Sequence, residues 1–334
     1  MIAFVTGGTG FVGAHMVRAL LRDGARVRVL VREGSDRSNL DGLDVEVVYG
    51  DLREQERLSP LLKGCDELYH VAAFYSTRAE DGPTMFEINV RGTKNLLMAA
   101  LESGMQRVVH TSTIGTIGRP AGGGLPTEET AFNLWETCSD YVKSKYLGEM
   151  VALSMVSYGL PVIVVHPCAP VGTHDIKPTS TGQRILDYMR GKRPSFPPGG
   201  INFIAVQDVA QGHLLAAHKG RTGQHYILGN AQGNLTLEGF CALMAQVSGV
   251  RFPAEAQGAP LTRLKKAVGA IHESPLHSVV REERGRQPAA LICDPSKAIR
   301  ELGLPQTPLE IALAEAVRWF RDHGYLSKAQ AVKG

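Results

Sequence analysis

Tyr141 and Lys145 are spaced so that their side chains could share an acid–base task. They lie four residues apart in the segment Tyr-Val-Lys-Ser-Lys, and residues at that spacing share one face of a helix. A nearby ammonium group favours the phenolate and would lower the pKa of Tyr141 from its usual value of about 10. A tyrosine tuned in this way can exchange a proton with a substrate oxygen near neutral pH.

Two hydroxyl groups follow a short apolar run that we expect to be a strand. Val108–Thr111 is rich in valine, and Ser112 and Thr113 come next in the chain. In a doubly wound sheet, ligands bind outside the carboxyl ends of the strands. Hydroxyl groups at such a strand end therefore support the interpretation of Tyr141 and Lys145 as part of a ligand-binding site, which their spacing alone would not.

A glycine loop stands near the start of the chain. The segment Thr-Gly-Gly-Thr-Gly-Phe-Val-Gly covers residues 6–13, between an apolar run and a helical pattern. Gly7 allows a tight turn, Gly10 lets the backbone approach a pyrophosphate, and Gly13 lets the helix pack closely on the sheet. The N–H groups and positive dipole of the helix N-terminus favour phosphate groups. This strand–turn–helix context predicts a dinucleotide site.

Arg32 ends the second predicted strand and indicates which dinucleotide is bound. An NAD site usually has an acidic residue there, about 20 residues after the glycines, to hold the ribose hydroxyls. Arg32 instead suits the additional phosphate of NADP, because a guanidinium binds phosphate oxygens through charge-assisted hydrogen bonds. Arg37 could assist, whereas the neighbouring Glu33 is the opposing signal. The sequence favours NADP(H) and leaves NAD(H) open.

Strands and helices must alternate to position these residues. Short runs rich in valine and isoleucine suit strands that are buried on both faces. These runs are Ile2–Val5, Val27–Val31, Val45–Tyr49, Leu68–Val71, Val108–Thr111 and Val162–Val165. The helical patterns between them are Phe11–Arg22, Leu58–Leu62, Phe86–Glu102 and Tyr141–Val156. The alternation predicts an α/β fold with a doubly wound parallel (Rossmann) sheet.

The character of the chain changes after about residue 167, where turn residues become frequent. We expect a cofactor-binding domain at 1–167, with strand and helix returns near 201–230, and a smaller, mostly helical substrate domain at 168–334. The patterns in this half are helices at Val206–His218, Leu235–Ser248 and Pro308–His323 and a strand at Gln224–Leu228. Arg251–Gln287 has weak periodicity and clustered charge, and it fits either a lid or a plain connection.

Composition limits the classes of function. The 334 residues are 43% hydrophobic and 21% charged, and the formal net charge of +3 is too small to indicate a nucleic-acid partner. The cysteines are scattered without a CxxC pair and no HExxH segment occurs, so we predict neither a disulfide framework nor a metal site. No apolar run approaches the roughly 20 residues of a membrane helix, and no signal peptide is visible, so we expect a cytoplasmic protein.

Taken in order, the motifs resemble those of the extended short-chain dehydrogenases/reductases. Besides the glycine loop and Tyr-Val-Lys-Ser-Lys, they are Asp51-Leu52, His70-Val71-Ala72-Ala73, Asn89-Val90-Arg91-Gly92-Thr93, Thr111-Ser112-Thr113, His166-Pro167 and Asp294–Gly303. The likeness covers nearly the whole chain except residues 250–290. Within the family, the chain resembles a subgroup that holds the dihydroflavonol reductase-like proteins and the hopanoid-associated sugar epimerases. Val31-Arg32, Val71-Ala72-Ala73 and Asp175–Thr179 resemble the epimerases of this subgroup in particular.

This resemblance implies a role for each matching residue. Tyr141 would be the acid/base, Lys145 would bind the nicotinamide ribose and lower the tyrosine pKa, and Thr113 would hydrogen-bond the substrate carbonyl. Ser112 is the alternative hydroxyl if the register slips, and Asn89 is expected only to position its helix. The other residues that would border the cofactor are Gly7, Gly10, Phe11, Val12, Asp51, Leu52, Ala72, Ala73 and Pro167.

The same three side chains fit two chemistries. A ketone or aldehyde reductase passes hydride from NADPH to the carbonyl carbon while Tyr141 supplies the proton. A nucleotide-sugar epimerase or dehydratase oxidises and re-reduces its sugar and usually keeps NAD bound, so Arg32 favours the reductase. A third class is a cofactor-binding regulator without catalysis. The intact Thr113–Tyr141–Lys145 set argues against it, because such a regulator does not need these side chains.

The partners follow from the remaining charges and apolar faces. Residues 202–208 lack the arginine with which nucleotide-sugar members usually meet a diphosphate, so we expect a small carbonyl or alcohol substrate. Four cations could still bind an anionic substrate, and the alternative is that they are solvated surface charges. They are Lys177, Arg184, Lys192 and Arg193. The helices Phe86–Glu102 and Tyr141–Val156 could form a homodimer interface. The apolar residues that could line this interface are Leu147, Met150, Val151 and Met155. Packing within one subunit is an equally good interpretation of these residues.

Overall fold

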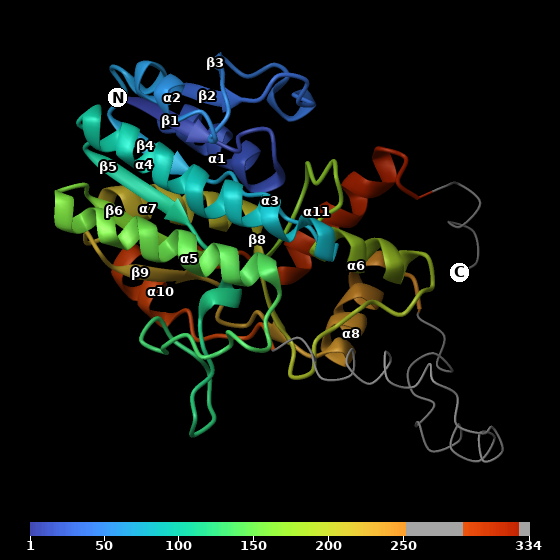
Figure 1. The fold of residues 1–334 in the computed structure, drawn as a ribbon. Helices are drawn as coiled ribbons and strands as arrows, with labels where there is room; N and C mark the ends of the chain where they lie inside the picture. Colours follow the sequence, from blue (N-terminus) through green and yellow to red (C-terminus); the bar gives the residue numbers. More distant parts are fainter. Residues whose placement is uncertain (252–289, 327–334) are drawn as a thin grey trace, which may run out of the picture.

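The computed structural model describes residues 1–251 and 290–326 (Figure 1). Seven parallel strands form the main sheet in the order β3-β2-β1-β4-β5-β6-β9. Their bounds are β1 Ile2–Thr6, β2 Arg26–Val31, β3 Val45–Tyr49, β4 Glu67–His70, β5 Arg107–Thr111, β6 Val162–Pro167 and β9 His225–Leu228. The predicted α/β fold with a doubly wound parallel sheet is confirmed.

Helices cover both faces of this sheet, because its strands carry apolar side chains on both sides. Helices α1, α7 and α10 share one core cluster with the sheet, and α2, α4 and α5 share the other. Their bounds are α1 Phe11–Arg22, α2 Gln55–Leu62, α4 Thr93–Glu102, α5 Asp140–Ser154, α7 Val206–Lys219 and α10 Ser296–Leu302. A strand and a helix from the second half of the chain, β9 and α7, pack into the main sheet and its core.

The strand order reverses between β1 and β4, and this reversal determines where a ligand-binding crevice forms. Connections from neighbouring strands diverge at such a point and leave a crevice at the carboxyl ends of the strands. The glycine loop leaves β1, residues 71–75 leave β4, and Ser112 and Thr113 leave β5. The predicted functional segments therefore lie at one edge of the sheet.

A smaller unit with its own sheet and core packs beside the main sheet. Strand β8 pairs in parallel with β7 and antiparallel with β10, and helices α6, α8 and α11 complete this core (Figure 1). The bounds are β7 Ala169–Val171, α6 Ser180–Met189, β8 Ile201–Ala205, β10 Asn234–Leu235, α8 Leu237–Ser248 and α11 Leu309–Asp322. Sequence patterns predicted α8 and α11 but missed α6 and the three strands. The domain boundary at residues 167 and 168 stays a prediction.

The helix predicted as Phe86–Glu102 is not one regular helix. It consists of α3 (Gly82–Phe86), a π-helical segment η3 (Glu87–Gly92) and then α4. A Cβ on Gly92 would lie 2.9 Å from the Cβ of Leu52, so the π-helical segment passes close to the loop after β3. Most of the predicted lid or connection at Arg251–Gln287 falls outside the described residues. Within residues 1–251 and 290–326, every helix is too short or too polar to cross a bilayer.

Candidate active site

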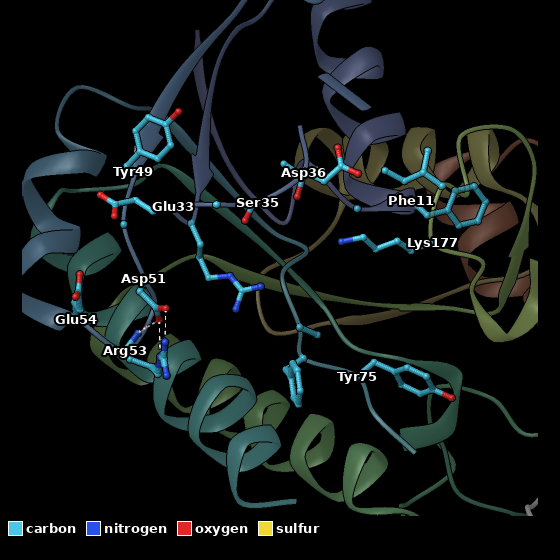
Figure 2. Close-up of a pocket in the computed structure, with 18 of the residues that line it drawn as sticks. Phe11, Glu33, Ser35, Asp36, Tyr49, Asp51, Arg53, Glu54, Tyr75 and Lys177 are labelled. Carbon is cyan, nitrogen blue, oxygen red and sulfur yellow. Dashed lines mark hydrogen bonds and ion pairs between the residues drawn. The ribbon is translucent and has the colours of Figure 1, made fainter. Parts of the chain in front are cut away.

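A cavity of about 960 Å³ lies along the carboxyl ends of β1, β4, β5 and β6, and the smaller unit forms its far wall. Every residue predicted for the site lines it. These residues are Gly7, Gly10, Phe11, Val12, Arg32, Asp51, Leu52, Ala72, Ala73, Thr113, Tyr141, Lys145 and Pro167. A second cavity of about 860 Å³ shares Gly10, Arg32 and Asp51 with the first and extends it toward β3 (Figure 2). The structure thus brings the whole predicted set together.

The glycine loop is shaped by close backbone contacts. Gly7 has a φ of +74°, and a Cβ there would lie 2.6 Å from the backbone nitrogen of Ala72. A Cβ on Gly13 would lie only 2.0 Å from the carbonyl oxygen of Gly7. Helix α1 begins after Gly10 without a side-chain cap, so the N–H groups of its first turn face the cavity region without a side-chain acceptor. This arrangement can receive a phosphate group.

Arg32 lies exposed after β2, where its guanidinium makes no hydrogen bond or ion pair to the described residues. Asp51 across the cavity is held by Arg53 at 2.8 Å, as Figure 2 shows, and hydrogen bonds from Arg53 lower the pKa of Asp51. Arg37 lines neither cavity and donates to the hydroxyl of Tyr49 at 2.7 Å. Of the two arginines considered for a phosphate, Arg32 alone lines the cavity.

Tyr141 and Lys145 lie one turn apart on α5. Burial leaves Lys145 3% exposed, and its Nζ donates to the carbonyl oxygen of Thr111 at 2.6 Å. This burial lowers the pKa of Lys145 to about 8, although Glu149 opposes the shift.

The phenol of Tyr141 is shifted in the direction opposite to the sequence prediction. Burial, assisted by Tyr75, raises the pKa of Tyr141 to about 12. The ring of Tyr75 packs edge-on against that of Tyr141, with centroids 4.8 Å apart. The predicted lowering by Lys145 is not seen: its ammonium donates to a backbone carbonyl, and burial of the phenol decides the direction of the pKa shift.

Thr113 and Ser112 are distinguished by what their hydroxyls bind. Thr113 precedes the short helix η4 (Ile114–Thr116), and its Oγ1 accepts from the N–H of Gly115 at 3.3 Å, which leaves its proton available. Ser112 is 4% exposed and donates to the carboxylate of Glu149 at 2.6 Å. The geometry therefore favours Thr113 over Ser112 as the hydroxyl that meets a ligand.

Asn89 ties the loop after β4 to the helix that carries Tyr141. Its side chain accepts from the N–H of Phe74 at 2.8 Å, donates to the carbonyl of Phe74 at 2.9 Å and donates to Ser144 on α5 at 3.0 Å. These contacts are those of a residue that positions its neighbours.

Several cavity residues come from segments without a motif. Tyr75 and Arg119 line the wall and were missed, since each stands in a loop where no periodic pattern marks it. Arg184 on α6 also lines the cavity and donates to the carbonyls of Ser180 and Ser195. The other considered cations divide between the cavity rim and the exposed surface: Lys177 at the rim, Lys192 and Arg193 at the surface.

A doubly wound sheet with a glycine loop and a Thr–Tyr–Lys set at its switch point defines a class of dinucleotide-dependent enzymes. The family model described as "NAD dependent epimerase/dehydratase family" matches residues 3–229. The chain belongs to this family, the extended short-chain dehydrogenases/reductases, which are NAD(P)-dependent enzymes acting on carbonyl and alcohol groups.

Individual relatives include both reductases and dehydratases. A Synechocystis protein that carries the name dihydroflavonol 4-reductase is 40% identical over 332 residues, covering 97% of this chain and 95% of that protein. The crystal structure of gox2253 has a TM-score of 0.84 at 36% identity, covering 98% and 99% of the two chains. The dTDP-glucose 4,6-dehydratase DesIV of Streptomyces venezuelae, solved with NAD, has a TM-score of 0.77 at 26% identity, covering 99% and 100%.

Proposed function

We propose that the protein is an NADP(H)-dependent reductase that converts a ketone or aldehyde to an alcohol. The observation that carries this proposal is one continuous cavity with Arg32 at one end and Thr113, Tyr141 and Lys145 at the other, joined by the glycine loop. Its volume of about 960 Å³ is that of a small-molecule or cofactor site, and its reactive side chains suit a carbonyl group.

The residues present fit a nicotinamide dinucleotide. The uncapped start of α1 would receive the pyrophosphate, and Arg32 would bind the 2′-phosphate of the adenosine ribose. Asp51 and Leu52 would border the adenine, and Ala72, Ala73 and Pro167 would continue the wall toward the nicotinamide. When bound, the cofactor supplies a hydride to the carbonyl carbon.

The side chains of this protein then handle the carbonyl oxygen. Thr113 donates a hydrogen bond that orients it, and Tyr141 gives it a proton. The raised pKa of Tyr141 keeps the phenol protonated at neutral pH, the form needed for reduction. Lys145, whose ammonium is buried at the cavity wall, would hold the nicotinamide ribose by donating to its hydroxyls.

A nucleotide-sugar epimerase or dehydratase is the second candidate, because the family name and the DesIV match favour it. The segment at 202–208 weighs against it, since its polar side chains serve the fold. Asn202 bonds Asn230 and Asn234, Gln207 bonds Glu315, and the carboxylate of Asp208 accepts from Thr307. No arginine stands in this segment to meet a diphosphate.

A homodimer through α4 and α5 is also proposed, with fewer apolar candidates than the sequence suggested. Met150 is 37% exposed and remains available, and Leu147 and Val151 are half-buried. Met155 packs inside the core of its own subunit and is not part of such an interface.

The test follows NADPH absorbance with a panel of aldehydes, diketones and hydroxyketones. We expect steady NADPH consumption with at least one carbonyl, and slower consumption with NADH. Protein that purifies with bound NAD and turns over no carbonyl, but interconverts a nucleotide sugar, would instead identify an epimerase. Cofactor binding without any turnover would identify the non-catalytic class.

A further inference from the structure

A buried group of polar side chains connects the cavity wall to a partly exposed histidine on β9, the strand beside β6. It consists of Ser112, Thr116, Glu149, His166 and His225. Glu149 accepts from Ser112 at 2.6 Å and from Thr116 at 2.9 Å, and its other oxygen lies 3.4 Å from Nδ1 of His225. The His225 side chain is 24% exposed, whereas the other four residues are buried. None of them belongs to the proposed catalytic set.

The two imidazoles meet end to end. Nε2 of His166 lies 3.0 Å from Nδ1 of His225, and the ring planes differ by 18°. The ring centroids are 5.3 Å apart, which is about the N–N distance plus the two radii from centroid to nitrogen. Centroids and nitrogens therefore lie nearly on one line, and one ring donates its N–H directly to the lone pair of the other.

This alignment argues against a metal ion between the same side chains. Glu149, His166 and His225 are ligand types for zinc, and one ligand atom from each lies within 4.8 Å of the others. A metal would need both ring nitrogens to direct their lone pairs at a third point. The nitrogens instead point at each other, so the geometry is that of a shared proton.

The hydrogen bonds continue from the imidazoles to the cavity. Nδ1 of His166 lies 3.1 Å from Oγ1 of Thr116, which lies 3.0 Å from Oγ of Ser112. Ser112 lines the cavity together with Thr113 and Lys145. Imidazoles and hydroxyls both donate and accept hydrogen bonds. The hydroxyls of Ser112 and Thr116 both donate to Glu149, and that of Thr116 also donates to the carbonyl oxygen of Thr113 at 2.8 Å. A proton therefore passes from Thr116 to Ser112 when the hydroxyl of Thr116 turns from these acceptors toward Ser112.

We propose that His225, His166, Thr116 and Ser112, with Glu149 beside them, form a proton path from solvent to the active site. This inference rests on the proposed reductase. Each reduction moves a hydride to the carbonyl carbon and a proton from Tyr141 to its oxygen, and the oxidised cofactor leaves with the alcohol. One proton enters at His225 and one leaves Ser112 into the cavity that Tyr141 and Lys145 also line, where the phenolate regains its proton.

The surroundings of His166 and His225 keep both imidazoles neutral, so that neither ring retains a proton it accepts. The groups that face the imidazoles are Glu149 and Lys145 from α5 and Lys297 from α10. Burial lowers the pKa of His166 and of His225 to about 4, and Lys297 adds to both shifts. Both rings are therefore neutral at pH 7, so a proton accepted by one is passed on readily.

The test replaces the exposed end of the path in the full-length protein. We expect His225→Ala to lower kcat for carbonyl reduction at least tenfold, with KM and NADPH affinity unchanged, because the side chain touches neither ligand. Free imidazole added to the assay should restore most of the lost rate. The matched control is His218→Ala, since His218 is a surface histidine of α7 outside the path; it should keep the wild-type rate and show no response to imidazole.

Three results would overturn the proposal. One is an unchanged kcat in His225→Ala. Another is a loss of rate that imidazole does not restore and that accompanies a lower melting temperature, which would show a structural role only. The third is tightly bound zinc in the purified protein that His225→Ala removes.

A measurement without substrate keeps this test separate from that of the proposed function. In protein labelled with 15N-histidine, NMR should show a ring proton coupled to nitrogens of both His166 and His225, and His225→Ala should abolish it. If the wild type reduces no carbonyl, the proposed function and the path's role in it fail, whereas absence of this coupling refutes the path alone.

Discussion

The two ends of the cavity are built differently. The end with the glycine loop is formed by backbone from one continuous segment, where Gly7 and Gly13 have no room for a Cβ. The reactive end is formed by side chains from separate elements, with Thr113 after β5 and Tyr141 and Lys145 on α5. Backbone shape decides one end, and burial and hydrogen bonding of side chains decide the other. Changes at the two ends should therefore affect binding and chemistry separately.

The largest effect should come from Tyr141→Phe. Removing the hydroxyl that donates the proton should lower kcat by about 100-fold or more, while NADPH affinity stays within about twofold because the ring remains. Steady-state rates and a fluorescence titration of NADPH measure the two quantities. An unchanged kcat would show that another group supplies the proton.

Gly13→Ala should chiefly harm the binding end. Its new Cβ would lie 2.0 Å from the Gly7 carbonyl, so the loop must shift, and we expect NADPH affinity to fall at least tenfold. Gly24→Ala is the control, because Gly24 has a φ of +80° and its Cβ would contact nothing within 4 Å. It should lose about 1–2 kcal/mol of stability and keep its cofactor affinity. Equal loss of affinity in both variants would show that the loop has no special role.

Arg32→Gln should separate the two cofactors. Hydrogen bonds to a charged group contribute about 1.5–3 kcal/mol, so NADPH affinity should fall roughly 10- to 100-fold, with NADH affinity within about twofold. Arg26→Gln is a suitable control, since Arg26 is an exposed arginine at the start of the same strand. A parallel loss for NADPH and NADH would contradict a 2′-phosphate contact.

The smallest effect is a change in rate with pH. The pKa of Lys145 is lowered to about 8, so its ammonium is present below that pH and is lost above it. The rate of reduction should therefore be level below about pH 8 and decline above it, as measured by kcat at saturating NADPH in a series of buffers. A rate that stays level up to pH 10 would show that the charge of Lys145 is not needed.

The sequence predicts the parts of the molecule that local pattern encodes. Six strands of the main sheet follow from apolar runs and the seventh from the pattern at Gln224–Leu228, and the glycine loop follows from spacing and context. The strands β7, β8 and β10 were missed because they lie among turn residues, and α6 was missed because its first turn reads Ser-Thr-Gly. In these segments, packing around the core of the smaller unit outweighs the local propensity of the sequence.

The site shows the same division. Spacing predicts the pair Tyr141 and Lys145, and the family resemblance implies Thr113, but neither predicts the direction of the pKa shift of Tyr141. That direction depends on burial and on Tyr75, which reaches the phenol from a different loop. The end-to-end contact of His166 and His225 is likewise invisible in sequence, because it joins residues 59 positions apart through the pairing of β6 with β9.

The central claim is that this protein makes a net transfer of hydride from NADPH to a carbonyl carbon. NADPH deuterated at the transferring position of the nicotinamide tests it directly, with the product examined by mass spectrometry and NMR. We expect one deuterium per molecule, on the new carbinol carbon, and one oxidised cofactor per alcohol formed. A substrate that is interconverted while the cofactor returns unchanged would contradict the claim.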